Sequence, residues 1–512
     1  MTDRGERLAP FGKPRAVTIG VLTRIRDAAR DETLDRLCTI LAVAGIALLG
    51  LRRWILIGPY PPGLDGAQWL ALGRGLLGYG RSTDGAYAPL GPILATIGES
   101  MAGPLDAIRL LAALSGLAVS LTVWLVARDL LGPVWGLIAT AIVIPASALV
   151  EPALFGGYPQ LLALAAGLLA LWASCRYLAT GDRGGLWQAG VAGFAAAGAH
   201  HVYFPVFTLS ILVAIGFWLS GETPTNRLER IRALALAFVP AFTLFVAVAF
   251  TFVRAGYAAP LDASARSFAR GWEYGTRESP VLWLGILVTG VTSLAFLWQT
   301  RGSLGWLLAA SLLLPSGLLF VISGQPRLLP PIIVGAGLAA GFGARRIAAL
   351  GLPARAVTLL VAVLLAATLV FPADRAASRF ADFYQVVDKS LVDAAAAIEV
   401  DGASGMVAVR QDRRGWPIGW WFEALLQRPV IVGADPRWLA FPDEWEHARQ
   451  ADALFDGGLD ASAFRQLVDS ADVRYLVVAK WDWIGWERWT STPGFPVSVL
   501  YDDDRYLVLR VT

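Results

Sequence analysis

Residues 37–66, LCTILAVAGIALLGLRRWILIGPYPPGLDG, decide the fold class of this chain. Residues 37–57 are almost continuously apolar, and a helix needs about 20 such residues to cross the core of a bilayer. A Gly- and Pro-rich loop follows and carries one carboxylate, Asp65. We therefore predict that the chain crosses a membrane here and leaves Asp65 just past the end of its first span.

The composition of the whole chain is that of a membrane protein. Of its 512 residues, 56% are hydrophobic and only 16% are charged, with a mean hydropathy of +0.56. Soluble domains carry roughly a quarter charged residues. We predict spans at residues 37–57, 106–127, 133–150, 158–175, 186–200, 203–219, 233–252, 281–298, 303–322, 328–344 and 354–371. The sequence thus predicts about 11 transmembrane helices, with the shorter stretches 66–78 and 89–103 lying at the membrane interface as helices.

The distribution of charge divides the chain into three regions. Residues 1–36 form a charged tail, residues 37–372 hold the apolar stretches, and residues 373–512 carry charges every few positions. The third region alternates helical and strand patterns. We therefore predict a polytopic α-helical membrane protein with a C-terminal soluble α/β domain. The acidic residues 502–504 lie between the last two expected strands, which indicates a hairpin with a solvated turn more strongly than a metal site.

Tryptophan and cysteine say less about function. Nine of the 20 tryptophans lie between residues 416 and 489. Sugar rings stack on indoles, but Trp also fills cores and anchors proteins at membrane interfaces, and we favour packing and anchoring. The two cysteines, Cys38 and Cys175, fall in apolar stretches. They cannot staple the soluble domain, and their spacing does not indicate zinc.

Basic residues predict the orientation in the membrane. The N-terminal tail carries Arg4, Arg7, Lys13, Arg15, Arg24, Arg26, Arg30 and Arg36. The positive-inside rule keeps such a tail in the cytoplasm, and an odd number of spans then places residues 373–512 outside. We expect a multi-pass plasma-membrane protein in contact with membrane lipids. The formal net charge of +3 says little about partners, and nothing in the sequence points to nucleic acid.

Several arginines depart from this rule, because they fall in loops that should be poor in basic residues. They are Arg74, Arg81, Arg254, Arg266, Arg270, Arg277 and Arg327. Two interpretations stay open for the long loop 253–280. Long loops translocate regardless of charge. Alternatively, some of these arginines hold an anion, since the guanidinium suits bidentate contact with phosphate.

Four outer segments each offer a polar group at a similar depth, and such groups are candidates for function. Asp65 follows the first span, although a lone Asp there is more often a helix cap or a solvated loop residue. Glu151 is the ionisable group of the second outer loop and would face Asp65 if the first and third spans were neighbours. The adjacent pair His200-His201 ends the fifth span. Adjacent residues point to different sides of a helix, so we expect at most one to face a site, which disfavours a two-His metal site. Arg327 opens the tenth span.

These features together resemble the integral-membrane glycosyltransferases of the GT-C superfamily. The resemblance lies in the first span ending at Asp65, the amphipathic helix after it, and the stretch YAPLGP at 87–92. It extends to GGYP at 156–159, His200 after a Gly/Ala-rich helix, and Arg327 before Leu-Leu-Pro-Pro. It covers roughly the predicted membrane domain.

The resemblance implies transfer of a sugar from a polyprenyl-phosphate donor to a lipid or glycan acceptor on the outer face. Asp65 would be the general base, and attack from the opposite face would invert the anomeric centre. Arg327, with an arginine of loop 253–280 such as Arg254, would stabilise the departing phosphate. Glu151 would orient the acceptor, and His200 would donate to the phosphate or sugar, although packing at a helix end explains His200 equally well.

The metal requirement stays open at this point. The first outer loop has no Asp-x-Asp or Glu-x-Asp, only Asp65 followed by Gly66, which departs from the family pattern. A divalent cation such as Mg or Mn prefers oxygen ligands, and Asp65 and Glu151 are the residues that would supply them.

Two other classes of protein compete with this hypothesis. A transporter or lipid flippase with an extracytoplasmic domain would show internal repeats and ionisable groups near the midplane of the bilayer. The sequence shows no repeat, and its polar groups gather at one face, but Pro145 and Pro315 interrupt apolar stretches as in transporters. A scaffold whose helices only anchor the soluble domain would show no dependence on Asp65.

Overall fold

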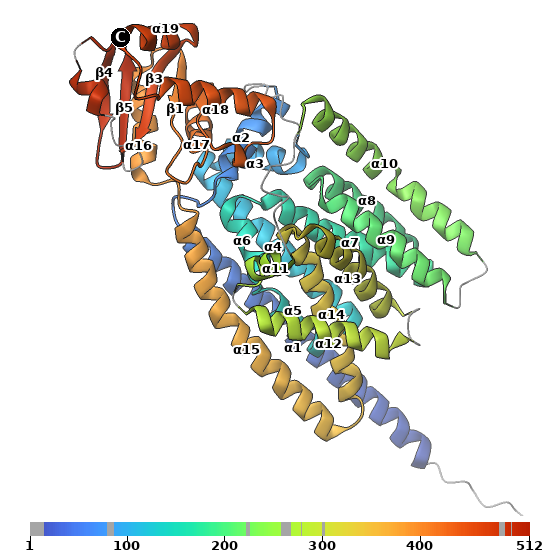
Figure 1. Cartoon of the computed structure of the whole chain (residues 1–512). Helices are drawn as coiled ribbons and strands as arrows, with labels where there is room; N and C mark the ends of the chain where they lie inside the picture. The colour runs from blue at the N-terminus through green and yellow to red at the C-terminus, as the bar shows by residue number, and fades with distance from the viewer. Residues whose placement is uncertain are drawn as a thin grey trace, which may run out of the picture.

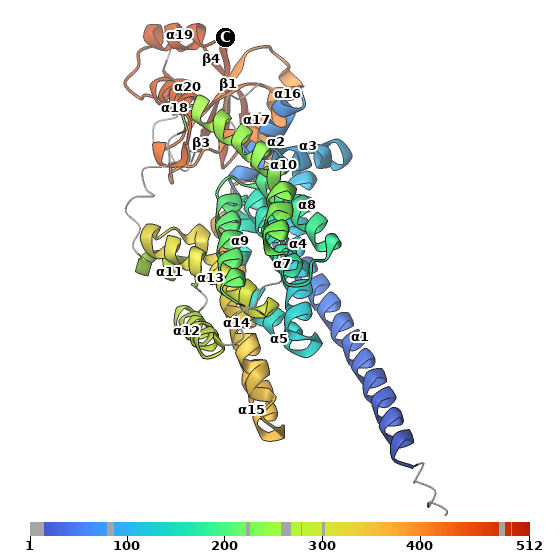
Figure 2. The ribbon, with the colours of Figure 1, turned by 90° about the vertical axis from the view of Figure 1, so that its right-hand side faces the viewer.

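The computed structural model of the chain describes residues 15–78, 87–221, 226–257, 268–277, 279–298, 303–480, 487–492 and 494–512. It has an elongated helical body with a small sheet domain at one end (Figure 1). The N-terminal part of α1 projects from the opposite end, as the second view also shows (Figure 2). Arg81 and Arg266, and Trp481, Trp483 and Trp486 of the tryptophan group, lie outside the described residues.

The helical body contains α1 (Arg15–Ile57), α2 (Asp65–Leu76), α3 (Leu90–Ala102), α4 (Pro104–Leu131), α5 (Pro133–Val143), α6 (Ser147–Phe155), α7 (Tyr158–Thr180), α8 (Arg183–Ala199), α9 (Tyr203–Leu219), α10 (Arg227–Arg254), α11 (Phe268–Gly275), α12 (Pro280–Phe296), α13 (Leu304–Ser323), the short 3₁₀ turn η3 (Pro326–Leu328), α14 (Leu329–Ala348) and α15 (Leu352–Phe383). Two of the boundaries between consecutive helices occur at Gly-Pro pairs. Gly103 and Gly132 adopt positive φ, and Pro104 and Pro133 begin the next helices. Glycine tolerates that backbone, and proline suits the first helical position.

Seven helices of the described chain are long and apolar enough to cross a membrane. They are Glu32–Ile57, Pro104–Leu131, Tyr158–Thr180, Arg227–Arg254, Leu304–Ser323, Pro326–Ala348 and Arg355–Phe383. The bent pair α5–α6, which meets at 56°, makes an eighth if it is one span, and α9 and α12 are shorter apolar helices. The expected count of about 11 therefore stays a prediction. The two stretches expected not to span form the short helices α2 and α3.

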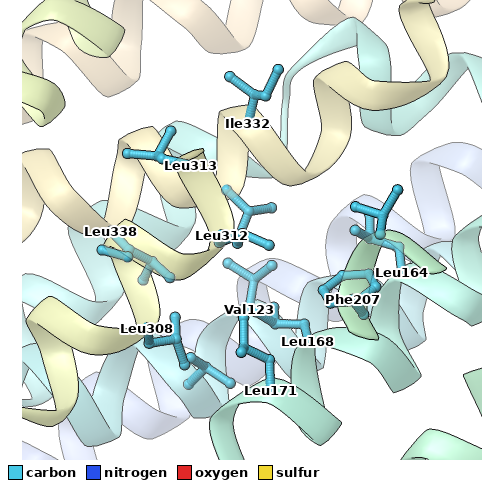
Figure 3. Packing of buried hydrophobic residues seen from close by; sticks show 14 of the residues in the cluster. Val123, Leu164, Leu168, Leu171, Phe207, Leu308, Leu312, Leu313, Ile332 and Leu338 are labelled. Carbon is cyan, nitrogen blue, oxygen red and sulfur yellow. The ribbon is translucent and has the colours of Figure 1, made fainter. Parts of the chain in front are cut away.

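The core of the helical body surrounds α7. Of its most apolar window 72% is buried, and of that of the α14 span 78%, against 17% for α1 and for α15, which lie at the periphery. Leu164, Leu168 and Leu171 of α7 pack among side chains of α4, α9, α13 and α14 (Figure 3). Gly167 lets α9 approach, because a Cβ there would meet the ring of Phe207. Small residues at helix contacts allow such close packing in membranes.

The C-terminal domain is α/β, as predicted. Its elements are α16 (Lys389–Asp401), β1 (Met406–Val409), α17 (Gly419–Leu426), β2 (Val430–Val432), η4 (Pro436–Trp438), α18 (Pro442–Leu454), α19 (Ala461–Ser470), β3 (Val473–Ala479), α20 (Glu487–Ser491), β4 (Val497–Asp502) and β5 (Tyr506–Val511). The strand order is β2-β1-β3-β5-β4, in which β1 pairs in parallel with β2 and β3, and β5 is antiparallel to β3 and β4. The last two strands form the expected hairpin. Asp503 accepts the backbone N–H groups of Arg505 and Tyr506 in its turn, each at 2.7 Å.

One boundary differs from the sequence pattern. Helix α15 continues past residue 372, the expected end of the membrane domain, to Phe383, and the first helix of the sheet domain begins at Lys389. Asp388 caps it by accepting the N–H of Leu391 at 2.8 Å. A capping side chain satisfies a backbone donor that has no partner inside the helix, so the helix starts where the cap stands.

The sheet domain packs directly on α2 and on the loop before it. Trp421 of α17 is fully buried, and its Nε1 donates to the carbonyl oxygen of Gly63 at 2.9 Å. Arg74 of α2 is also buried and forms an ion pair with Glu99 of α3, while its guanidinium donates to the carbonyl oxygen of Ala424 at 2.7 Å. Trp416 and Trp420 are buried as well, whereas Trp438 is 43% exposed, so packing is the role of part of this tryptophan group. The two domains thus share one interface.

Arg74 gives a prediction about stability. We expect Arg74→Met to lower the free energy of unfolding by about 3–5 kcal/mol, because it leaves the buried carboxylate of Glu99 without its partner. Thermal unfolding of the protein purified in detergent measures the loss. Arg449→Met is the matched control, since Arg449 pairs with Glu446 on an exposed face and should change stability by less than about 1 kcal/mol. Equal melting temperatures for the two variants would contradict the assignment.

Candidate active site

Asp65 is the first residue of α2, and the turn between α6 and α7 holds it in place. The N–H of Leu64 donates to the carbonyl oxygen of Phe155 at 3.0 Å. The Nε1 of Trp69, one turn further along α2, donates to the carbonyl oxygen of Gly156 at 2.6 Å. The carboxylate at the start of this helix is therefore fixed on both sides.

Two glycines make this contact close. Gly63 and Gly156 have φ of +111° and +112°, a backbone that favours glycine. A Cβ on Gly63 would lie 2.7 Å from the carbonyl of Phe155, and one on Gly156 would lie 2.8 Å from the Cβ of Asp65. The GGYP stretch singled out in the sequence therefore packs against Asp65 itself.

The surroundings of Asp65 suit a base. Its side chain is half-buried, and this burial raises the pKa of its carboxyl to about 6, against the opposing effect of the positive charge of Arg327. A carboxylate with such a pKa is ionised at neutral pH but accepts a proton more readily than an exposed Asp. The nearby hydroxyl of Tyr158 is buried and has no hydrogen-bond partner among the described residues.

Arg327 lies in η3, at the entrance to α14. Its carbonyl oxygen accepts the hydroxyl of Tyr203 at 2.7 Å, and that hydroxyl accepts the Nε2 of Gln160 at 3.0 Å. These two hydrogen bonds fix the position of the backbone at Arg327. The guanidinium is exposed, and within the described ranges it forms no hydrogen bond or ion pair, although its charge acts on Asp65 and on His201. A positioned backbone with a free cation suits a site for an anion.

Both His200 and His201 lie near Arg327, although the sequence led us to expect at most one of them at the site. Helix α8 ends at Ala199, and His200 has extended backbone, so the helical argument for opposite sides does not apply. The two rings stack with centroids 4.8 Å apart. The Nδ1 of His200 accepts the N–H of Val202 at 3.2 Å, which leaves its Nε2 as a donor. The ring of His201 packs 4.6 Å from that of Phe252.

Glu151 does not meet Asp65 in the way that we expected. It is buried in α6, and its Oε1 accepts the hydroxyl of Tyr384, at the end of α15, at 2.7 Å. Phe155, one turn later, is the α6 residue that bonds to the segment before Asp65. In the described parts of the chain, no three His, Cys, Asp or Glu side chains are grouped as metal ligands. We therefore derive no step through a metal.

The other outer arginines divide into three kinds. Arg74 is structural, as described above. Arg277 lies over the ring of Phe380, with 5.3 Å between the guanidinium carbon and the ring centroid, and Arg270 is exposed in α11. Arg254 ends α10 and is exposed, two residues after Phe252. Arg254 thus lies at the rim of the aromatic group around His201, and the structure does not bring it to Asp65.

Tyr87 is a site residue whose role the sequence did not show. Its ring packs edge-on against Trp69 at 5.1 Å, Phe252 at 5.6 Å and Phe441 at 5.6 Å. Burial, with the negative charges of Glu444 and Asp65, raises the pKa of its phenol well above the usual value, so it stays protonated. It is therefore a hydrogen-bond donor placed near both carboxylates. Its only sequence signal was its place in the YAPLGP stretch.

The solved structures of other proteins confirm the fold class. The fold is similar to the archaeal oligosaccharyltransferase AglB from Archaeoglobus fulgidus in complex with an inhibitory peptide and a dolichol-phosphate, at TM-score 0.56 and 12% identity over 86% of this chain and 69% of that one. It is similar to ArnT from Cupriavidus metallidurans bound to undecaprenyl phosphate, at TM-score 0.61 and 15% identity over 91% and 97%. It is also similar to the arabinofuranosyltransferase AftD from Mycobacteria, at TM-score 0.59 and 16% identity over 91% of this chain and 40% of that one.

The comparisons by sequence add no closer relative. No family model and no curated protein matches the chain. At these identities the likeness concerns the fold alone, which this chain shares with an oligosaccharyltransferase, ArnT and an arabinofuranosyltransferase. The resemblance that the sequence predicted is thus confirmed for the fold.

Proposed function

We propose that this chain is a membrane glycosyltransferase that transfers a sugar from a polyprenyl-phosphate donor to a lipid or glycan acceptor. The observation that carries the proposal is the pairing of a half-buried Asp65 with the unpartnered guanidinium of Arg327 at one end of the helical body. One group accepts a proton and the other stabilises an anion, which are the two needs of this reaction. We assign this end to the outer face, because the basic N-terminal part of α1 lies at the other end.

The reaction balances with these two residues. Asp65 takes the proton of the acceptor hydroxyl as its oxygen forms a bond to the anomeric carbon. The bond from that carbon to the phosphate oxygen breaks, and its electron pair leaves with the polyprenyl phosphate. Arg327 holds the additional negative charge of this leaving group. Attack opposite to the leaving group inverts the anomeric centre.

Neighbouring groups have secondary roles in this scheme. The Nε2 of His200 and the hydroxyl of Tyr87 are donors that orient the phosphate or the sugar. Arg254, at the rim, attracts the anionic donor as it approaches. Glu151 holds Tyr384, whose carbonyl oxygen accepts the N–H of Gly63 at 2.9 Å, and so supports the loop before Asp65.

The known structures support the class of donor. AglB and ArnT were solved with dolichol-phosphate and undecaprenyl phosphate respectively. Such a lipid keeps its tail in the bilayer and its reacting carbon at the interface, close to the membrane-facing end of α2 and η3. Another AglB structure is a complex with Zn and sulfate.

A direct assay tests the proposed function. The purified full-length protein is incubated in bilayer nanodiscs with a panel of polyprenyl-phosphate sugars and candidate acceptors, and release of polyprenyl phosphate is followed. We expect release with at least one donor, and release that depends on acceptor. Transport of a solute into liposomes without any glycosyl transfer would instead favour the transporter hypothesis.

The pKa of Asp65 gives a prediction for pH dependence. Because burial raises this pKa from 3.8 to about 6, the base is protonated and inactive below pH 6. We expect kcat/KM to fall about tenfold per pH unit below that value and to level off above it. Glu444 also titrates, since burial raises its pKa to about 7. The profile of Glu444→Gln should therefore keep the limb near pH 6, and a profile without that limb would remove Asp65 as the base.

A further inference from the structure

Glu444 joins the sheet domain to the helix that carries Asp65. It lies in the first turn of α18, and its Oε2 accepts the N–H groups of Ala440 at 2.8 Å and Phe441 at 3.2 Å. Its Oε1 accepts the Nε2 of Gln68 at 2.9 Å. Gln68 lies on α2, three residues after Asp65, so the two side chains share one face of that helix. One carboxylate therefore binds its own helix and the catalytic helix at once.

The rest of this junction also belongs to the site. Phe441, one of the two residues whose N–H groups Glu444 accepts, is buried with Ala88, Val248, Phe252 and Ala440. Its ring packs 5.6 Å from that of Tyr87. The N-terminus of α18 is thus part of the wall around Tyr87, whose phenol lies close enough to Asp65 to feel its charge.

Glu444 is more buried than a carboxylate that only caps a helix. A capping carboxylate works on the surface, where water solvates its charge. Glu444 is half-buried, and burying a carboxylate is unfavourable unless other groups bind it. Its neighbour Glu446 on the same helix pairs with Arg449 on the exposed face instead. The burial of Glu444 follows from its contact with Gln68.

We propose that Glu444 is a positioning residue: its hydrogen bond to Gln68 locks the sheet domain onto α2 and holds Asp65 in register with Arg327 and Tyr87. The lock is a property of the fold, and only its effect on turnover rests on the proposed function. The C-terminal domain then sets the geometry of the reacting carboxylate from a position far along the chain.

Hydrogen–deuterium exchange of the full-length protein tests the lock without an activity assay. Gln68→Met removes the bond and leaves the cap of α18 intact. We expect amides in residues 65–76 to exchange roughly tenfold faster, which is the usual order for a lost hydrogen bond to a charged group. Glu444→Ala should give the same acceleration, and the double variant should add nothing to it.

Two controls separate the lock from simple capping. Glu444→Gln can still accept the backbone N–H groups and can donate to the Oε1 of Gln68, so its α2 exchange should stay close to that of the unmodified protein. Glu446→Ala should also leave α2 unchanged. If Gln68→Met leaves exchange in α2 unaltered, Glu444 is only a cap and the proposal is wrong.

Activity gives the second readout. In the glycosyl-transfer assay, Gln68→Met should lower kcat by roughly tenfold with KM nearly unchanged, because Asp65 is displaced while the donor site remains. Unchanged kcat with accelerated exchange would remove the catalytic role of the lock. Accelerated exchange in a protein that shows no transfer at all would keep the lock and reject the proposed function, so the two failures are distinct.

Discussion

Asp65→Asn should lower kcat/KM for glycosyl transfer by about 10³-fold, because it removes the group that accepts the acceptor proton and preserves its shape. The effect should fall on kcat at every pH, since the amide of Asn does not become a base when the pH rises. Steady-state kinetics of the purified variant, with release of polyprenyl phosphate as the signal, measures it.

Thermal unfolding distinguishes this loss from misfolding. Burial raises the pKa of Asp65, so the folded state disfavours its ionised form at neutral pH. Replacing it by a neutral side chain should therefore leave the melting temperature unchanged or raise it, as happens when function requires an unfavourable group. Asp129→Asn is the control for the chemical change, because Asp129 is exposed and lies near the C-terminal end of α4. Full activity in a folded Asp65→Asn protein would reject the assignment of the base.

Arg327→Met should lower kcat by about 10²–10³-fold, because the leaving phosphate loses the cation that stabilises its charge. Arg327→Lys should recover part of the rate, since an ammonium restores the charge without the bidentate geometry. A second effect follows from the positive charge of Arg327, which lowers the pKa of Asp65 against the larger effect of burial. Without that charge, the acid limb of the pH profile should move to higher pH.

Arg254→Met is the informative comparison for Arg327. Arg254 is exposed at the end of α10, so its loss should reduce kcat less than tenfold and act mainly on donor capture at low ionic strength. If Arg254→Met lowered kcat more than Arg327→Met, the phosphate would bind at the rim, and the assignment of Arg327 would be wrong.

Much of the fold could be predicted because its signals are local. A run of about 20 apolar residues implies a span wherever it occurs, and alternation of apolar residues implies a strand. The bent pair α5–α6 was predicted as a single span over 133–150, which covers α5 and only the first half of α6, since hydropathy does not report a bend. Asp65, His200 and Arg327 were found from their positions at the ends of such stretches.

The errors about the site came from contacts between distant residues. Glu151 was predicted to face Asp65 if the first and third spans are neighbours, and its hydrogen bond runs to Tyr384, 233 residues away. Arg74 was grouped with candidate anion-binding arginines, but the sheet domain and Glu99 enclose it. The two histidines were assigned to one helix, which ends before them. Hydropathy and spacing do not contain these pairings.

By itself, the sequence determined that this is a multi-span membrane protein with a C-terminal α/β domain, and it placed one carboxylate and one arginine just outside apolar stretches. Those properties depend on how favourably each segment transfers from water to lipid, and the composition of that segment alone determines this. Only the tertiary structure decided that Glu444 reaches Gln68 across 376 residues and that Gly156 packs on Asp65. Such contacts depend on how the helices and the sheet domain pack together, and no local pattern specifies that packing.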